Sequence, residues 1–324
     1  MSDALGTILL QLYRVARGVP SPEFKDAALN AIKADLPFES AGWGTFAISP
    51  QGARVQSVHT HELPMQMMAD YEAVKQYDTL SAKALSRPGT TINVSVDDTK
   101  WKMHPAMLAH VRKWGLDHSL GTIFIDPALN LCTAVSLYRG ASGKPFTDRE
   151  RKLKQQIMMH LVEAWNLNAL LYVDRSANQS DTPGRARALI DREGTIYNAD
   201  AGLPALMHAE FPGWTGPQIP PSVAQPLLGA NGESFRGDAI VASRTRVLDD
   251  GLSLISVRPL AGIDRLSARE RVVAREFAAG KTHKEIAHEL GISPATVRNQ
   301  LQAAYQKLGV STKIELAQQL NDSV

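Results

Sequence analysis

The chain has 324 residues, 44% of them hydrophobic, which predicts two or three domains with ordinary buried cores. No run approaches the roughly 18 apolar residues of a membrane span, and the N-terminus lacks the cationic start and cleavage site of a secretion signal, so we expect a cytoplasmic protein. Its net charge is only +2, and its single cysteine, Cys132, excludes an internal disulfide.

Residues 1–173 alternate helical and extended patterns. Apolar residues at helical spacing predict helices over residues 5–17, 24–34, 64–74, 104–114 and 148–172, with a further helical segment up to Leu85. Strand-forming runs cover residues 42–49, 54–60, 92–96, 120–125 and 132–138, the first two joined as a hairpin. This order predicts an α/β domain in which helices pack on one sheet.

A polar segment separates that domain from a smaller one. Residues 174–184 carry Asn, Ser, Pro and Gly without periodicity, which indicates a linker. Residues 185–262 then predict two hairpins and a helix: strands over 188–191 and 195–198, a short helix beginning at Asp200, and strands over 234–248 and 252–258. We expect a small α+β domain that acts as a spacer or, as the alternative, binds a ligand.

Residues 263–324 predict an all-α domain of four short helices. Ser267 and Glu270 have the spacing of a capping box, which begins the first helix. Gly280 and Gly291 end the first and second helices, because glycine adopts the left-handed conformation without steric cost. Ser293 can cap the third helix, with Pro294 at its first position.

The third helix has two different faces. Apolar residues at helical spacing predict a face turned to a small core: Val297, Leu301, Ala304 and Leu308. The opposite face carries side chains that can hydrogen-bond base edges in a DNA major groove: Thr296, Arg298, Asn299, Gln302 and Gln306. A helix, a short turn and this helix together form a helix-turn-helix unit.

In order and spacing, this segment resembles the LuxR-type helix-turn-helix domain of bacterial transcription regulators. The residues that carry the resemblance are Leu266, Ser267, Glu270, Gly280, Lys284, Glu285, Ile286, Ala287, Leu290, Ile292, Ser293, Thr296, Val297, Lys307, Leu308, Gly309, Val310, Lys313, Glu315 and Leu316. Gln300 stands where most of that family has histidine.

The resemblance implies a DNA-binding regulator that works as a homodimer on double-stranded DNA, with RNA polymerase as a further partner. It implies that Arg298, Asn299 and Gln302 face the bases, and that Lys284, Thr296 and Lys307 lie nearer phosphates; Ser293 completes the expected set. Residues 311–320 would form a fourth helix used in dimer contacts. The chain's small basic excess falls in this segment, where residues 264–324 hold nine Lys and Arg against seven Asp and Glu.

The N-terminal layout is similar to the GAF-like or autoinducer-binding-like sensory domains that precede LuxR-type helices in many regulators, and residues 185–262 resemble a small PAS domain. Tyr71 and Tyr77-Asp78 are similar to the tyrosine and aspartate region of acyl-homoserine-lactone receptors. Met67 and Val94 stand where those receptors have tryptophan, so the resemblance does not extend to the lactone itself.

The sensory resemblance implies a small-molecule effector. Ligand pockets are mostly apolar with a few placed polar groups, and the candidates to line one here are Trp43, Tyr71, Tyr77, Asp78, Trp101 and Trp114. The alternative for each of these aromatic residues is an ordinary place in the core.

The patterns of catalysis and metal binding are missing. The sequence has no GxSxG and no GxxxxGK[ST], and His59 and His61, two residues apart on one predicted strand, have no third ligand at a recognisable spacing. We therefore expect no enzyme activity, no cofactor and no metal. The alternatives to a ligand-responsive regulator are a sigma-factor-like region or a helical protein-docking module.

Overall fold

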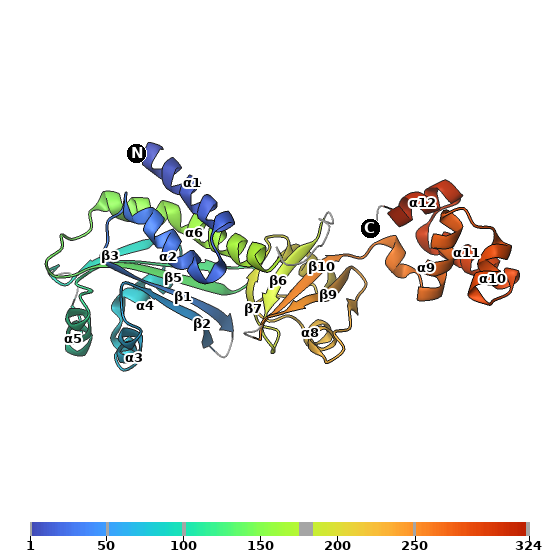
Figure 1. The fold of residues 1–324 in the computed structure, drawn as a ribbon. Helices are drawn as coiled ribbons and strands as arrows, with labels where there is room; N and C mark the ends of the chain where they lie inside the picture. Colours follow the sequence, from blue (N-terminus) through green and yellow to red (C-terminus); the bar gives the residue numbers. More distant parts are fainter. Residues whose placement is uncertain (1, 50–51, 99–101, 175–183, 249–250, 322–324) are drawn as a thin grey trace.

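The computed structural model describes residues 2–49, 52–98, 102–174, 184–248 and 251–321 (Figure 1). Two sheets, each with its own helices, come first along the chain, and a group of short helices forms the C-terminal end. None of the helices in these ranges is long and apolar enough to cross a membrane.

The first sheet is antiparallel throughout, in the order β2-β1-β5-β4-β3. Its strands are β1 (Ser40–Ser49), β2 (Gly52–His61), β3 (Thr91–Ser95), β4 (His118–Asp126) and β5 (Leu131–Arg139). All five predicted strands are confirmed, and each is slightly longer than or offset from its predicted range. The predicted hairpin is the pair β1 and β2.

Helices cover both faces of this sheet. One face carries α1 (Ser2–Gly18), α2 (Ser21–Lys33) and the long α6 (Asp148–Asp174). The other carries α3 (Gln66–Glu72), the 3₁₀ turn Lys75–Tyr77, α4 (Thr79–Leu85) and α5 (Pro105–Lys113). Successive strand residues point to opposite faces, so Val135 and Leu137 pack under α6, whereas Cys132 and Ala134 face α4.

The second sheet has the order β7-β6-β10-β9-β8. Its strands are β6 (Ala186–Ile190), β7 (Ile196–Ala199), β8 (Phe235–Arg236), β9 (Ile240–Val247) and β10 (Ser253–Pro259), and the helices α7 (Leu203–Glu210) and α8 (Pro221–Leu228) share its core. The helix expected from Asp200 begins at Leu203, and α8 has no counterpart in the sequence-based prediction because Pro220, Pro221 and Pro226 obscure its helical pattern.

One predicted strand of this sheet is two. The run over residues 234–248 breaks between β8 and β9, where the carboxylate of Glu210 accepts hydrogen bonds from the backbone N–H groups of Asp238, Ala239 and Ile240. A residue of α7, distant in the sequence, thus ends the strand inside the run that the sequence predicts as one strand. Burial alone would raise the pKa of Glu210, but these three hydrogen bonds outweigh it and lower the pKa.

Residues at one end of the first sheet pack in the hydrophobic core of the second sheet. Leu129, in the turn between β4 and β5, is 4% exposed and packs in the second core together with Leu131 of β5. Polar contacts join the same two regions: the Asn130 side chain donates to the carbonyl of Gly216 at 2.8 Å, and Arg54 of β2 pairs with Asp191. The two sheet regions are therefore in contact with each other. Most of the predicted linker, residues 174–184, lies outside the described residues.

The C-terminal domain consists of a 3₁₀ turn (Gly262–Arg265), α9 (Ala268–Ala278), α10 (His283–Leu290), α11 (Pro294–Leu308) and α12 (Lys313–Asn321). The predicted capping box of Ser267 and Glu270 is present, and Gly291 ends α10 in the left-handed conformation with φ +66°. The four predicted helices are confirmed, and they enclose one small apolar core.

Candidate functional site

The third helix of the C-terminal domain presents a polar face. Its N-terminus is capped by Ser293, whose hydroxyl accepts the backbone N–H of Thr296 at 3.1 Å. Val297, Leu301 and Ala304 are at most 3% exposed. Helical geometry then turns the other side of α11 outward, and the side chains exposed on it are Arg298, Asn299, Gln302, Gln306 and Lys307.

The two candidate phosphate-contacting lysines differ in their surroundings. Lys284 lies exposed on α10. Lys307 is paired instead within the domain, because its ammonium donates to both carboxylate oxygens of Glu270 at 2.9 and 2.7 Å. These bonds, followed by the one from the Ser267 backbone, lower the pKa of Glu270. Gln300, the residue that departs from the family pattern, has a buried side-chain oxygen without a hydrogen-bond partner.

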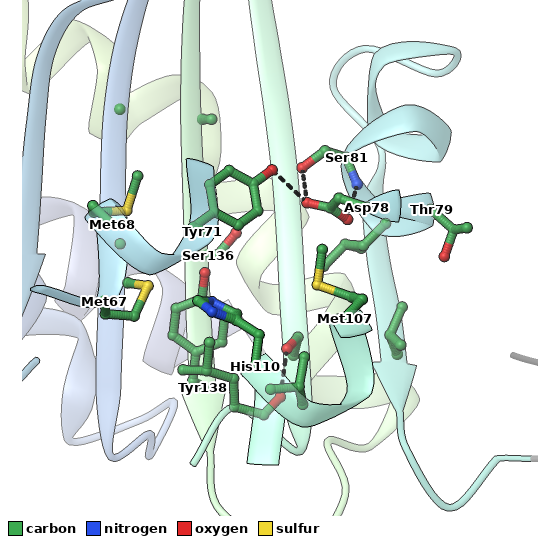
Figure 2. A pocket seen from close by; sticks show the side chains of 18 of the residues that line it. Met67, Met68, Tyr71, Asp78, Thr79, Ser81, Met107, His110, Ser136 and Tyr138 are labelled. Carbon is green, nitrogen blue, oxygen red and sulfur yellow. Dashed lines mark hydrogen bonds between the residues drawn. The ribbon is translucent and has the colours of Figure 1, made fainter. Parts of the chain in front are cut away.

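A cavity of about 170 Å³ lies between the first sheet and the helices α3, α4 and α5 (Figure 2). It exists because the strands present small side chains there: Gly42 and Gly44 on β1, Ala134 and Ser136 on β5. Apolar side chains from the helices form the opposite wall, among them Met67, Met68, Leu80, Met107 and Val111.

One end of the cavity is polar and already organised. Asp78 caps α4, and its carboxylate accepts the Ser81 backbone N–H at 2.9 Å, the Ser81 hydroxyl at 2.6 Å and the Tyr71 hydroxyl at 2.8 Å (Figure 2). Burial, followed by the nearby Asp78 carboxylate, raises the pKa of Tyr71, which therefore stays protonated and can donate. The fixed Asp78 carboxylate still has lone pairs for a further donor.

His110 is a second polar group of the cavity, and sequence reasoning missed it. The residue is 6% exposed, and its Nε2 is buried without a hydrogen-bond partner. Its ring centroid is 5.9 Å from that of Tyr71. Burial lowers the pKa of His110, so the imidazole is neutral near pH 7 and offers one donor and one acceptor. No motif marked this histidine, because only the packing of α5 on the sheet brings it to the cavity.

The candidate ligand residues from the sequence lie in different places relative to the cavity. Tyr71 and Asp78 line it. Trp43 lies among the residues around it, but its side chain packs on the opposite face of the sheet against Phe24 and Trp165.

Two aromatic candidates do not line the cavity. Tyr77 stacks on His104 with ring centroids 3.6 Å apart, and Trp114 lies beneath the ammonium of Lys113 at 4.8 Å. Trp101 lies outside the described residues. β5 contributes two polar residues that the sequence analysis did not single out, Ser136 and Tyr138.

The histidine pair on β2 has a structural partner. Asp26 of α2 lies 3.0 Å from Nε2 of His59 and 2.6 Å from Nδ1 of His61, which ties α2 to the edge strand. Burial would raise the pKa of Asp26, but the hydrogen bonds from His61 and His59 outweigh it and lower the pKa. No cluster of three or more histidine, cysteine or acidic side chains fit for a metal ion occurs in the described ranges.

Comparison with known proteins addresses the C-terminal domain. Residues 264–320 match the family of bacterial regulatory proteins described as the luxR family. Over 55 residues the chain is 47% identical to the spore germination protein GerE of Bacillus subtilis, a match that covers 17% of this chain and 74% of GerE. This chain belongs to the luxR family of bacterial regulatory proteins.

Other members of the luxR family share part of the chain. The transcriptional regulatory protein UhpA of Salmonella typhimurium is 38% identical over 111 residues, which is 32% of this chain and 57% of UhpA. The match thus spans just over half the length of UhpA. Among solved structures, the N-acylhomoserine-lactone-dependent LuxR-family factor CepR2 from Burkholderia cenocepacia aligns with 54% of this chain and 99% of its own, at 18% identity and a TM-score of 0.39.

Proposed function

We propose that this luxR-family protein is a sequence-specific DNA-binding transcription regulator whose N-terminal domain binds a small molecule. The outward face of α11 carries the DNA-binding part of the proposal. Because Val297, Leu301 and Ala304 are buried, Arg298 and Asn299 are held on a rigid helix with their side chains free to enter a major groove. The protein would act as a homodimer on double-stranded DNA, with α12 in the dimer contact and RNA polymerase as a further partner.

Individual residues of the face have different proposed roles. Arg298, Asn299 and Gln302 read base edges. Lys284 contacts phosphate. Ser293, which caps the helix, and Thr296, whose hydroxyl hydrogen-bonds that of Ser293, lie near phosphate. Lys307 can reach phosphate only by exchanging its ion pair with Glu270.

Affinity measurements on DNA test this division of roles. A duplex selected by the full-length protein from a random library, and a scrambled duplex, would be titrated over a salt series. Asn299→Ala is expected to weaken specific binding by roughly 1–3 kcal/mol and to relax discrimination at one base, whereas the control Lys284→Ala weakens both duplexes alike. Equal losses on both duplexes for Asn299→Ala would contradict base reading, and no salt-dependent binding by the wild-type protein would favour a protein-docking module.

The sensory part of the proposal rests on the cavity between the first sheet and the helices α3, α4 and α5. Its described lining contains the carboxylates of Asp78 and Asp117 and no lysine or arginine, which disfavours an anionic ligand. The unpartnered Nε2 of His110 and the free lone pairs of Asp78 would bind polar groups of an otherwise apolar, uncharged molecule. We assign this domain, residues 1–173, to the GAF-like or autoinducer-binding-like sensors.

The remaining assignments follow from this organisation. We propose that residues 174–184 form a linker, that residues 185–262 form a PAS-like connector without a ligand in its own core, and that residues 263–324 form the DNA-binding domain. The protein is proposed not to be an enzyme, in keeping with relatives that are transcription regulators. A ligand can shift the balance between two domain arrangements only if it binds one arrangement more tightly than the other.

Native mass spectrometry of the full-length protein, purified from its own host, tests the sensor. The wild-type protein is expected to be a dimer that retains a defined small mass. Ala134→Trp should fill the cavity and lose that mass, whereas Leu10→Trp, at an exposed position on α1, should keep it. A wild-type protein without any retained mass, or an Ala134→Trp variant with the same mass, would argue against a ligand in this cavity.

A further inference from the structure

A second cavity, of about 300 Å³, lies where the second sheet meets the C-terminal helices. Three arginines and three serines line it, together with one apolar and one acidic residue: Ser234, Arg236, Val241, Ser243, Ser256, Arg258, Asp264 and Arg271. Arg236 and Arg258 belong to the sheet, whereas Asp264 and Arg271 belong to the DNA-binding domain. The cavity is distinct from the proposed sensor site, which lies on the first sheet.

Strand register builds the sheet side of this cavity. Ala242, Ile255 and Val257 are fully buried toward α7 and α8, so their neighbours along β9 and β10 point to the opposite face. On that face Val241 is paired with both Arg258 of β10 and Arg236 of β8. The two arginines therefore flank one small side chain, with their backbones about 10 Å apart across two strand spacings.

The cavity has a positive charge that its own residues do not balance. Asp264 is the one acid among the described lining residues, and it is bound by Arg258 through Nη1–Oδ2 at 2.5 Å and Nη2–Oδ1 at 2.7 Å. This pair holds the Arg258 guanidinium in place. The Asp264 carboxylate also attracts the charge of Arg271, so one carboxylate faces three guanidinium groups and the described lining keeps an excess of positive charge.

Arg271 has an unused donor there. Its Nε is buried without a hydrogen-bond partner, and its Nη2 contacts the carbonyl of Ile263 only at 3.4 Å. A buried donor of a charged group without an acceptor is costly, so a ligand oxygen bound at Arg271 Nε would be stabilised there. The hydroxyls of Ser234 and Ser243 add further donors to the same wall.

We propose that this cavity binds the phosphate group of a small phosphorylated molecule. Guanidinium groups match phosphate oxygens in charge and geometry, and serine hydroxyls complete such sites. The bound phosphate links Arg236 of the sheet to Arg271 of α9, and so fixes the DNA-binding domain against the connector. Its source is a free small molecule, because the site is a recess between two parts of the chain; a DNA backbone phosphate has the same chemistry and is distinguished by experiment.

Isothermal titration of the full-length protein with inorganic phosphate, at constant ionic strength set by chloride, tests the site. Wild-type protein is expected to show saturable binding. Arg236 is exposed, and Arg236→Gln should weaken phosphate binding at least about tenfold, the loss expected for one charge-assisted hydrogen bond. Arg244→Gln is the control. Arg244 lies on the neighbouring strand β9, and its side chain donates to the carbonyl of Gly229 outside the cavity, so this variant should bind phosphate as the wild type does.

A second arm separates the two sources of phosphate. In phosphate-free buffer Arg236→Gln should bind DNA with the affinity and salt dependence of the wild type. If the variant loses DNA affinity there, and phosphate competes with DNA for the wild type, the cavity holds the DNA backbone and the small-ligand assignment is wrong. Absence of saturable phosphate binding, or equal binding by wild type and Arg236→Gln, overturns the site altogether without affecting the proposed reading of DNA by α11.

Discussion

At the scale of single residues, Lys154 on α6 makes stability depend on pH. It is 2% exposed, and its ammonium donates to Oγ1 of Thr122 at 2.5 Å and to the carbonyl of Val135 at 2.9 Å. Burial lowers its pKa from 10.5 to about 7. Between these two values the unfolded chain binds more protons than the folded one, so the free energy of unfolding rises with pH. Lys154→Met should reduce that slope in urea denaturation measured from pH 7 to 10.

The slope should fall without vanishing, because burial also lowers the pKa of Lys25 to about 8. Lys152→Met is the control on the same helix: that side chain is 62% exposed and pairs with Asp148 at 2.9 Å, so the slope should stay as in the wild type. An unchanged slope in Lys154→Met would show that this ammonium is solvated in the folded protein.

At the scale of elements, the turn between α10 and α11 depends on the conformation of one glycine. Gly291 has φ +66°, and an added Cβ would meet no atom within 4 Å. The cost of Gly291→Ala is therefore conformational, and we expect a loss of roughly 1 kcal/mol in the free energy of unfolding of the DNA-binding domain.

Gly6→Ala provides the opposite case. Thermal or urea unfolding measures the stability of both variants. Gly6 lies inside α1, also has open space at the Cβ position, and has no positive φ. The substitution should stabilise the protein by roughly 0.5–1 kcal/mol, because alanine favours a helix interior. Stabilisation by both substitutions would contradict the left-handed cap at Gly291.

At the scale of the whole molecule, the turn between β4 and β5 joins the first sheet region to the second. β5 carries Ser136 and Tyr138 in the wall of the first cavity and Leu131 in the second core. Leu129→Ala should leave a hole in that second core, at a cost of roughly 2–5 kcal/mol. Hydrogen exchange should then accelerate in β6 and β10 and stay unchanged in α9 to α12.

The matched control is Leu10→Ala. Leu10 is 53% exposed on α1, so its truncation should change exchange little. If Leu129→Ala accelerated exchange in the first sheet alone, the two sheet regions would unfold independently of each other.

The sequence by itself determined the DNA-binding domain nearly completely. Its caps, glycine stops and apolar stripe are local signals a few residues apart, and Ser267, Gly291 and Val297 occupy the predicted positions. All five strands of the first sheet were also predictable, because alternation along a strand is local. Tyr71 and Asp78 could be placed at one site from a family resemblance and from their spacing of seven residues, and both line the cavity.

Only the tertiary structure decided what depends on contacts distant in the chain. Hydrogen bonds to Glu210 divide one predicted strand into β8 and β9. The Trp43 side chain points to the face of the sheet opposite the cavity, where it packs against Phe24. His110 and the arginine cavity have no motif, because each is assembled by packing elements that the sequence keeps far apart. Local periodicity determines which face of an element is apolar, but only packing decides which faces meet and which polar atoms are left without a partner.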